Sequence, residues 1–357
     1  MDARGGIRGR FAPSPTGGLH VGHAYIFLMA WLSVRSRGGT PVLRMEDIDP
    51  ARCRPEFAEG IVRDLAWLGL DYDEGPGRGG PYAPYAQSLR TARYTGILEA
   101  LEARGLLYPC WCSRKELRNL AGAPHADERS APYPGACRTL SREQRAEKER
   151  AGRKSCLRLD VRAALRELAA GRSLNAQAGS RSEAGKDASP AAGTAGLYVA
   201  DLFAGELKID EDACGGDFAL RRSDGVFSYQ LAVAADDADM AISEVVRGED
   251  LLSSTPRQAL LFFLLGKTPP LYIHLPLLLD AQGERPAKRH KSLELAALRG
   301  AGVCPRVLVG GIAHLCGLLD RPRPVAPREL LPGFGLAGLK GRRLRLPEPF
   351  AGFATGR

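Results

Sequence analysis

The apolar residues at the start of this chain change their spacing within the first fifty positions. A short apolar run from Ile7 to Ala12 stops at Pro13 and Pro15, which have no N–H to donate to a strand ladder. From residue 20 onward apolar residues recur at helical spacing, and a second apolar run covers Thr40–Met45. The order of strand, tight loop, helix and strand predicts the beginning of an open α/β sheet.

The loop between that strand and helix has the composition of an anion-binding turn. Gly17 and Gly18 let the backbone approach a ligand, and the helix that follows points its unpaired N–H groups at the loop. His20 and His23 lie three residues apart on one face, where imidazoles can donate to phosphate oxygens. An ordinary strand–helix turn with two capping histidines is the alternative that these residue types leave open.

Apolar periodicity predicts further elements downstream. We expect helices at Pro55–Gly69, at Tyr94–Arg104 and on the surface within 138–155, and a strand at Cys156–Val161. An Asp-Gly turn between the apolar runs Asp217–Arg222 and Val226–Ala234 predicts a β-hairpin. Residues 170–196 contain no aromatic and no β-branched apolar residue, which predicts a disordered insertion.

Charged residues follow or end several of these apolar runs. Glu46 directly follows the second strand, and ligands of open α/β sheets bind outside such strand ends, so we expect Arg10, His20 and Glu46 to converge. A solvated acidic turn that caps the next helix is the alternative for Glu46. Arg247 ends a buried apolar run, which is unusual unless it meets an anion. A salt bridge to Glu249 or Asp250 is its alternative.

Cysteine spacing indicates a metal site. Cys110 and Cys112 are followed across a loop by Cys137, and three thiolates in this pattern suit tetrahedral zinc. Coordination chemistry alone nominates His125, in the intervening loop, as the fourth ligand. Buried, reduced cysteines without metal are the alternative. Eight cysteines in 357 residues do not form the disulfide framework of a small secreted domain, so a reducing cytoplasm is expected.

Composition narrows the class of protein only slightly. The net charge is +9 and the pI about 9.2, which suits a polyanionic partner, although basic chains also occur without one. No run of about 18 apolar residues predicts a membrane span, and residues 1–9 lack the apolar centre of a signal peptide. A cytoplasmic protein without a membrane partner is therefore expected.

The segment from Arg10 to His23, R-F-A-P-S-P-T-G-G-L-H-V-G-H, resembles the HIGH signature of class I aminoacyl-tRNA synthetases. Its longer pattern is similar to the glutamyl branch, as are R-M-E-D-I-D around Glu46 and Y-Q-L-A-V-x-x-D-D from Tyr229. Cys-x-Cys followed by Tyr-x-x-x-Cys resembles the zinc site of the glutamyl-queuosine tRNA(Asp) synthetases, short paralogues of glutamyl-tRNA synthetase. The resemblance covers residues 8–318 outside the insertion.

The resemblance implies an α/β fold: a class I Rossmann-type catalytic domain with a small inserted zinc-bearing, acceptor-end-like domain and no anticodon-binding domain. The expected segments are catalytic half one at 5–106, the insert at 107–215, catalytic half two at 216–320 with a signature loop at 285–289, and a Pro/Gly-rich basic tail at 321–357.

The resemblance also implies the site residues. For L-glutamate they are Arg10, Phe11, Ala12, Pro13, Ser14, Glu46, Tyr229 and Arg247. For ATP they are His20, Gly22, His23 and Lys288, of which His20, His23 and Lys288 are expected to be catalytic. For structural zinc they are Cys110, Cys112, Tyr133 and Cys137, with His125 as the rival of Tyr133. Two arginines and one glutamate match the two carboxylates and one ammonium of glutamate. Glutamine would leave one arginine facing an amide, at a cost of ~2 to 4 kcal/mol.

The signature loop matches the KMSKS pattern only in part. Arg285, Pro286 and Ala287 replace its usual residues, whereas Lys288 is retained, and that lysine stabilises the triphosphate as pyrophosphate leaves. Pro286 can stiffen a loop that usually moves, which puts the rate of activation in doubt. A basic surface loop without a role is the alternative.

The implied activity is ATP-dependent formation of glutamyl-adenylate with Mg²⁺, independent of tRNA, and transfer of glutamate to queuosine in the anticodon of tRNA(Asp). The expected partners are L-glutamate, ATP and the anticodon stem-loop, and a monomer is expected. Two alternatives remain: a truncated glutamyl-tRNA synthetase that charges a tRNA 3′ end, and a non-catalytic paralogue that binds glutamate or a nucleotide.

Overall fold

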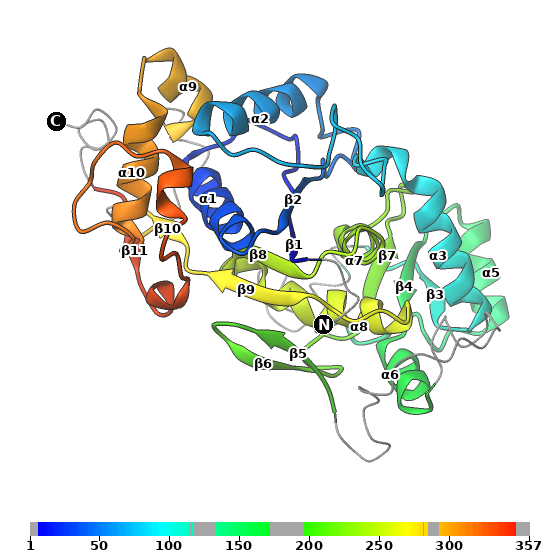
Figure 1. Cartoon of the computed structure of the whole chain (residues 1–357). Coiled ribbons are helices and arrows are strands. Elements are labelled where there is room, and N and C mark those ends of the chain that lie inside the picture. Colours follow the sequence, from blue (N-terminus) through cyan, green and yellow to red (C-terminus); the bar gives the residue numbers. More distant parts are fainter. Residues whose placement is uncertain are drawn as a thin grey trace.

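Figure 1 shows a computed structural model of the chain. The structure describes residues 6–113, 116, 133–171, 196–280, 282–284 and 293–347, and every structural statement below concerns these residues. Lys288 with the rest of 285–292, His125, and most of the expected insertion at 170–196 lie outside them.

A six-stranded sheet forms the centre of the molecule, in the order β2-β1-β8-β9-β5-β6. Its first five strands are parallel to their neighbours, and β6 pairs antiparallel with β5. Short, nearly continuous apolar runs form these strands because both faces of the sheet are covered. The strands are β1 (Arg8–Phe11), β2 (Thr40–Leu43), β5 (Leu197–Asp201), β6 (Gly205–Ile209), β8 (Glu244–Gly248) and β9 (Leu271–Leu275).

Helices bury the two faces of this sheet in separate hydrophobic cores. On β8, Val245 belongs to one core and Val246 to the other, as alternation along a strand requires. One core contains α1 (Val21–Arg35), α2 (Pro55–Leu68), α9 (Leu295–Gly300) and α10 (Pro305–Leu315). The other contains α3 (Thr91–Ala103), α7 (Tyr229–Asp239) and α8 (Thr255–Leu264). Figure 1 shows α1 and α7 on opposite sides of β1 and β8.

Helix α1 packs unusually close to the sheet. A Cβ atom at Gly9 would lie 2.4 Å from Cγ2 of Val34, so only glycine fits at this position of β1. Eleven of the fifteen residues of α1 are buried, which explains why its sequence is apolar almost all round. The close contact fixes the last turn of α1 against the start of β1.

A smaller antiparallel sheet has the order β3-β4-β7. Its strands are β3 (Leu107–Cys110), β4 (Cys156–Leu159) and β7 (Phe218–Arg221), and α5 (Arg142–Arg150) and α6 (Val161–Ala169) belong to the same part of the chain. The expected boundary at residue 215 does not separate the two sheets. Strands β5 and β6 precede it yet extend the large sheet, whereas β7 follows it and joins the small one.

The hairpin expected at 217–234 is wrong in its second half. Strand β7 and the turn form, but Tyr229–Asp239 is helix α7, and only an isolated bridge between Arg221 and Phe227 remains of the pairing. The Oγ atom of Ser228 accepts from the backbone N–H of Leu231 and caps the helix. The alanines and leucine after it are good helix formers, and they are fully buried in the core shared with α8.

The other expected elements are confirmed with small shifts of their ends. Helix α2 stops at Leu68 because Gly69 takes a left-handed conformation, with φ 78°. Helix α3 begins at Thr91, three residues before the expected start at Tyr94. Strand β4 ends at Leu159 because the side chain of Asp160 caps α6 through the N–H of Ala163.

The segment after residue 320, expected to be a basic tail, packs against the catalytic core as far as residue 347. Val325, Leu339 and Leu344 are buried there. Strand β11 (Leu344–Arg345) pairs in parallel with β10 (Leu278–Leu279). Strand β10 precedes, in the sequence, the signature loop expected at 285–289. In the part of the chain that the structure describes, no helix has the length and apolar character needed to cross a membrane.

Candidate functional site

The carboxyl ends of β1 and β2 place Glu46 beside the Arg10–Ser14 segment. Backbone hydrogen bonds continue between the two chains beyond the strands, from Arg44 N–H to the Phe11 carbonyl and from Glu46 N–H to the Pro13 carbonyl, both 2.9 Å. Phe11 and Pro13 are buried, Ala12 is half-buried and Ser14 is exposed. This edge of the sheet is where ligands bind in open α/β folds.

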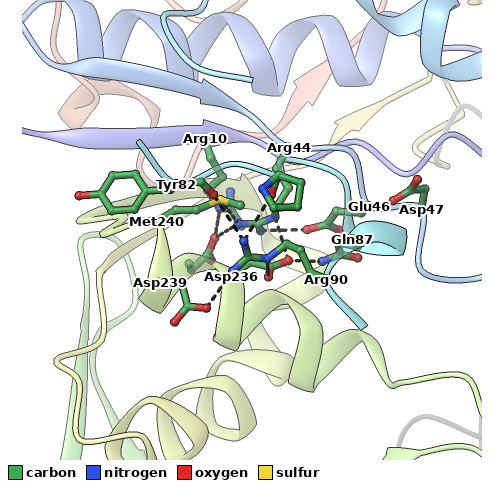
Figure 2. Close-up of polar contacts among 12 residues, drawn as sticks. Arg10, Arg44, Glu46, Asp47, Tyr82, Gln87, Arg90, Asp236, Asp239 and Met240 are labelled. Atoms are coloured by element: carbon green, nitrogen blue, oxygen red, sulfur yellow. Dashed lines mark hydrogen bonds and ion pairs between the residues drawn. The ribbon is translucent and has the colours of Figure 1, made fainter. Parts of the chain in front are cut away.

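Arg10 and Glu46 are linked through two charged residues that the sequence analysis missed, Arg44 and Asp237. The Nη1 atom of Arg44 lies 2.6 Å from Oδ1 of Asp237, and its Nη2 lies 3.1 Å from Oε1 of Glu46. The Nε atom of Arg10 approaches the same Asp237 carboxylate at 3.3 Å. All four side chains are at most 7% exposed. Figure 2 shows Arg10, Arg44 and Glu46 gathered around this network.

The network continues behind Arg44 to Asp236 of α7. Its carboxylate accepts hydrogen bonds from Arg90, Gln87 and Tyr94, at 2.6, 3.0 and 2.9 Å. Three guanidinium groups and three carboxylates are therefore buried together. Because these charges balance, the cost of removing them from water is offset mainly by their mutual attraction and hydrogen bonds. The six charged residues are Arg10, Arg44, Glu46, Arg90, Asp236 and Asp237.

The two carboxylates nearest the strand ends differ in their electrostatic balance. Burial raises the pKa of Asp237, but Arg44 and Arg10 outweigh burial and hold that pKa below its usual value. Burial also raises the pKa of Glu46, and there the same two arginines do not compensate fully, so it stays raised. Glu46 thus has less positive charge around it than an ionised carboxylate prefers, and a ligand ammonium group would supply the remainder.

Arg247, at the end of β8, is held entirely by neutral acceptors. Its Nε donates to Nε2 of His274 at 3.0 Å, and its terminal nitrogens donate to Oε1 of Gln258 and Oγ1 of Thr255 at 2.7 and 2.9 Å. The salt bridges to Glu249 or Asp250 weighed above do not form. Within the described part of the chain, the positive charge of this buried arginine therefore has no carboxylate in direct contact.

Tyr229, on the first turn of α7, lies close to Glu46, Arg247 and Arg10. Its pKa is raised by burial and by the charge of Glu46, while Arg247 and Arg10 act in the opposite direction. All three charged groups are thus near enough to one phenol to affect its ionisation. The structure thus places Arg10, Glu46 and Arg247 within electrostatic reach of Tyr229.

His20 and His23 form a reciprocal cap at the start of α1. The Nδ1 atom of His20 accepts from the N–H of Gly22, and Nδ1 of His23 accepts from the N–H of His20, both at 3.2 Å. The two ring centroids lie 3.8 Å apart. Because both Nδ1 atoms accept, each neutral ring carries its proton on Nε2. Capping and phosphate binding are therefore compatible roles, since they use different nitrogens.

The cysteine cluster has the dimensions of a metal site. The sulfur atoms of Cys110, Cys112 and Cys137 all lie within 4.8 Å of one another, and Cys112 and Cys137 are 3.5 Å apart. The Tyr133 oxygen lies 3.3 and 3.7 Å from the sulfurs of Cys110 and Cys112. Ligands of tetrahedral zinc with bonds of about 2.3 Å are spaced by about 3.8 Å. These four side chains therefore fit a zinc ion, and His125 lies outside the described residues.

Two residues beside this cluster were not singled out from the sequence. Cys156 is the cross-strand partner of Cys110 in the β3–β4 pair. The guanidinium carbon of Arg158 lies 4.0 Å from the centre of the Tyr133 ring, where a cation favours an electron-rich phenol. Both lie on the strand expected at Cys156–Val161, but that pattern did not reveal which strand pairs with it.

Comparison with known proteins agrees with this geometry. Residues 6–172 and 189–319 match the family described as tRNA synthetases class I (E and Q), catalytic domain. A glutamyl-Q tRNA(Asp) synthetase of Nitratidesulfovibrio vulgaris is 50% identical over 343 residues, 96% of each chain. A protein of the same name from Symbiobacterium thermophilum is 45% identical over 350 residues, 98% of each chain.

A solved structure of a glutamate tRNA ligase from Elizabethkingia meningosepticum, in complex with its amino acid, has the same fold. It superposes with a TM-score of 0.74 at 26% identity, covering 97% of this chain and 68% of that one. The matches extend along nearly the whole chain, and they include the strand ends that carry the buried charges. The protein is a ligase of the class I aminoacyl-tRNA synthetase type and belongs to the glutamyl-Q tRNA(Asp) synthetase family.

Proposed function

We propose that this enzyme activates L-glutamate with ATP, without tRNA, and transfers the glutamate to queuosine in the anticodon of tRNA(Asp). The observation that carries this proposal is the 50% and 45% identity to two glutamyl-Q tRNA(Asp) synthetases over nearly their whole length. The charges gathered around Tyr229 support the amino-acid part independently.

Glutamate recognition follows from charge complementarity. Among the described residues, the terminal nitrogens of Arg10 have no hydrogen-bond partner, and Arg247 has only neutral ones. These two guanidinium groups bind the two carboxylates of glutamate. Glu46, whose pKa is raised by burial despite Arg44 and Arg10, binds the ammonium group. Phe11, Ala12, Pro13, Ser14 and Tyr229 line the same site.

Activation forms a bond between a glutamate α-carboxylate oxygen and the α-phosphorus of ATP, and pyrophosphate leaves as the α–β phosphate bond breaks. Negative charge develops on the phosphate oxygens during this step. The Nε2–H groups of His20 and His23 and the N-terminus of α1 stabilise it, together with Lys288 and the Mg²⁺ that class I synthetases use. Gly22 keeps the backbone close to the triphosphate.

Transfer requires a hydroxyl group of the queuosine cyclopentenediol to attack the glutamyl carbonyl of the adenylate, with AMP as the leaving group. Correct placement of the two reactants supplies the rate. We propose that the segment 107–215 holds the anticodon stem-loop and that Zn²⁺ bound to Cys110, Cys112, Tyr133 and Cys137 shapes its loop. Zinc content after Tyr133→Phe and after His125→Ala substitution separates the two rival fourth ligands.

Transfer of radiolabelled glutamate to defined RNAs tests the acceptor. An isolated tRNA(Asp) anticodon stem-loop that carries queuosine should be labelled, and the same stem-loop with guanosine at that position should not. Full-length tRNA(Asp) trimmed of its CCA end should remain a substrate. Labelling of the guanosine stem-loop, or of neither stem-loop, would refute the proposed acceptor.

Charging of a tRNA 3′ end is the second candidate. The similarity to a glutamate tRNA ligase over 97% of this chain favours it. The same experiment decides, because removal of the CCA end would then abolish labelling. Glutamate-dependent exchange of pyrophosphate into ATP without any RNA tests the first half-reaction separately. Exchange that needs tRNA would show that activation is not independent of it.

A further inference from the structure

Behind Arg247 lies a chain of buried side chains that the proposed reaction does not yet use. Arg247 on β8 contacts His274 on β9, and His274 contacts Asp201 at the end of β5. The three strands are neighbours in the sheet, and Arg247 and His274 are direct cross-strand partners. Each of the three side chains is 4% exposed.

The hydrogen bonds fix the tautomer of His274. Arg247 can only donate, so Nε2 of His274 must accept, and the ring proton is on Nδ1. That proton faces Oδ2 of Asp201 at 2.5 Å. The other oxygen of Asp201 accepts from the N–H groups of Phe203 and Ala204 at 2.8 and 2.7 Å, so the carboxylate cannot rotate freely.

This arrangement keeps the charge of Arg247 available. Arg44 contacts carboxylates directly, whereas the carboxylate behind Arg247 is one imidazole ring away. Thr255 and Gln258 hold the terminal nitrogens, and the guanidinium carbon lies 5.0 Å from the Tyr272 ring centre. The guanidinium group is therefore fixed in place without being neutralised by a direct partner. A ligand carboxylate would be its first ionic partner.

We propose that Asp201 and His274 are positioning residues that make the pocket selective for a carboxylate. Asp201 orients His274 so that a lone pair, not an N–H, faces Arg247, and His274 then holds Arg247 toward the amino-acid site. This inference rests on the proposed function, because it takes Arg247 as a ligand of glutamate.

The sharpest test is Asp201→Asn, which preserves shape. The amide can donate to Nδ1 of His274, which moves the ring proton to Nε2 and turns an N–H toward Arg247. The KM for glutamate in pyrophosphate exchange should rise on the order of 10- to 100-fold, as for other lost orienting partners. The KM for ATP and the kcat at saturating glutamate should stay within about twofold of wild type, and the preference for glutamate over glutamine should fall.

Two further variants separate orientation from folding. His274→Gln retains an acceptor for Arg247 and should keep most glutamate affinity, whereas His274→Leu should lose it. Asp210→Asn makes the same change beyond the end of β6, at a half-exposed carboxylate paired with Lys208, and should leave the KM for glutamate unchanged. Histidine-ring nitrogen NMR reads the tautomer without any substrate.

The outcomes are distinguishable. Wild-type enzyme without glutamate-dependent exchange would refute the proposed function, and the selectivity role with it. Active wild type with an unchanged glutamate KM in both Asp201→Asn and His274→Leu would refute the positioning role alone. A wild-type ring protonated at Nε2 would do the same. Should Asp201→Asn not fold, the contrast between His274→Gln and His274→Leu decides.

Discussion

At the residue scale, buried arginines serve two different purposes in this enzyme. Arg44 is fully buried and forms ion pairs with three carboxylates, so it neutralises charge within the protein. Arg247 is buried among neutral acceptors, so its charge is available to the carboxylate that we propose it binds. Because both arginines are buried, burial does not distinguish the role of Arg44 from that of Arg247. The acceptor atoms do: they are carboxylate oxygens for Arg44 and neutral atoms for Arg247.

Loss of Arg44 should destabilise the fold severely. Arg44→Met leaves Asp237 and Glu46 buried with too little positive charge, and breaking such a group typically costs about 3–5 kcal/mol. Arg93→Met removes a half-exposed partner of Asp239 and should cost under about 1 kcal/mol. Urea unfolding of both variants measures the difference. Equal losses would show that Arg44 is no more important for stability than a surface arginine.

Stability should also depend on the protonation of His274. Burial lowers its pKa, Arg247 and Arg10 lower it further, and Asp201 only partly opposes them; the Tyr272 phenol ring stacks on the imidazole. The unfolded chain, with an imidazole pKa of about 6.5, therefore binds a proton at a higher pH than the folded chain.

The free energy of unfolding should thus fall as the pH drops through about 6.5. His274→Gln removes this contribution, so the loss between about pH 7.5 and about pH 5.5 should be smaller in the variant than in wild type. Urea titrations at both pH values measure it. Identical losses in the two proteins would contradict the lowered pKa.

The residues of the site divide into those that the sequence could reveal and those that it could not. Arg10 interrupts an apolar run, Glu46 directly follows one and Arg247 ends one, and charge is conspicuous at each of these places. Asp237 lies within the quoted D-D pair, but its partner Arg44 is 193 positions away, and no local pattern connects a strand end to the third turn of a distant helix. His274 lies inside the apolar run that forms β9, where no local pattern connects it to Arg247 or Asp201.

At the scale of elements, local signals located helices and strands better than they assigned their type. The Asp-Gly turn at 224–225 formed, but the apolar run after it became helix α7 because capping by Ser228 and burial against α8 outweighed the hairpin signal. This helix carries Tyr229 on its first turn and Asp236 and Asp237 on its third. The correction matters for the site, since residues seven apart, such as Tyr229 and Asp236, share a face of a helix but would point to opposite faces of a strand.

The proposed zinc site of Cys110, Cys112, Tyr133 and Cys137 should be needed for one half-reaction only, the transfer of glutamate to RNA. Cys112→Ser should lose bound zinc and reduce transfer to the queuosine stem-loop roughly tenfold or more, because the loop that contacts RNA is no longer fixed. Pyrophosphate exchange should remain within about twofold, since the amino-acid site lies on other strands. Cys304→Ser, at an exposed thiol, is the matched control. Loss of exchange together with zinc would contradict separate roles.

At the scale of the whole molecule, the order of strands in the large sheet was beyond the sequence patterns. Strands β5 and β6 follow a long insertion, yet they return to the edge of the catalytic sheet next to β9. The pairing of distant strands depends on tertiary packing, which periodicity does not encode. The motifs at the carboxyl ends of β1, β2 and β8 were nonetheless recognisable, because each stands beside or at the end of an apolar run.

The charge of the whole chain should govern RNA binding and not amino-acid binding. With a net charge of +9, the KM for the stem-loop should rise several-fold between about 50 and 200 mM salt as counterions compete for the phosphates. The KM for glutamate should change little, because its partners are buried and weakly screened. Steady-state kinetics at both salt concentrations measures the two constants. Parallel increases would indicate that the basic surface does not bind RNA.

Arg10 and Arg44 contact the same carboxylate, that of Asp237, and this shared contact has a consequence for engineering. A designer who wished to load an uncharged amino acid could not simply replace Arg10. Asp237 would then have Arg44 as its ion-pair partner without Arg10, and the contact between Arg44 and Glu46 would change as a result. Substitutions in this pocket should display strong epistasis, and laboratory evolution of a new specificity should proceed through coupled pairs of changes.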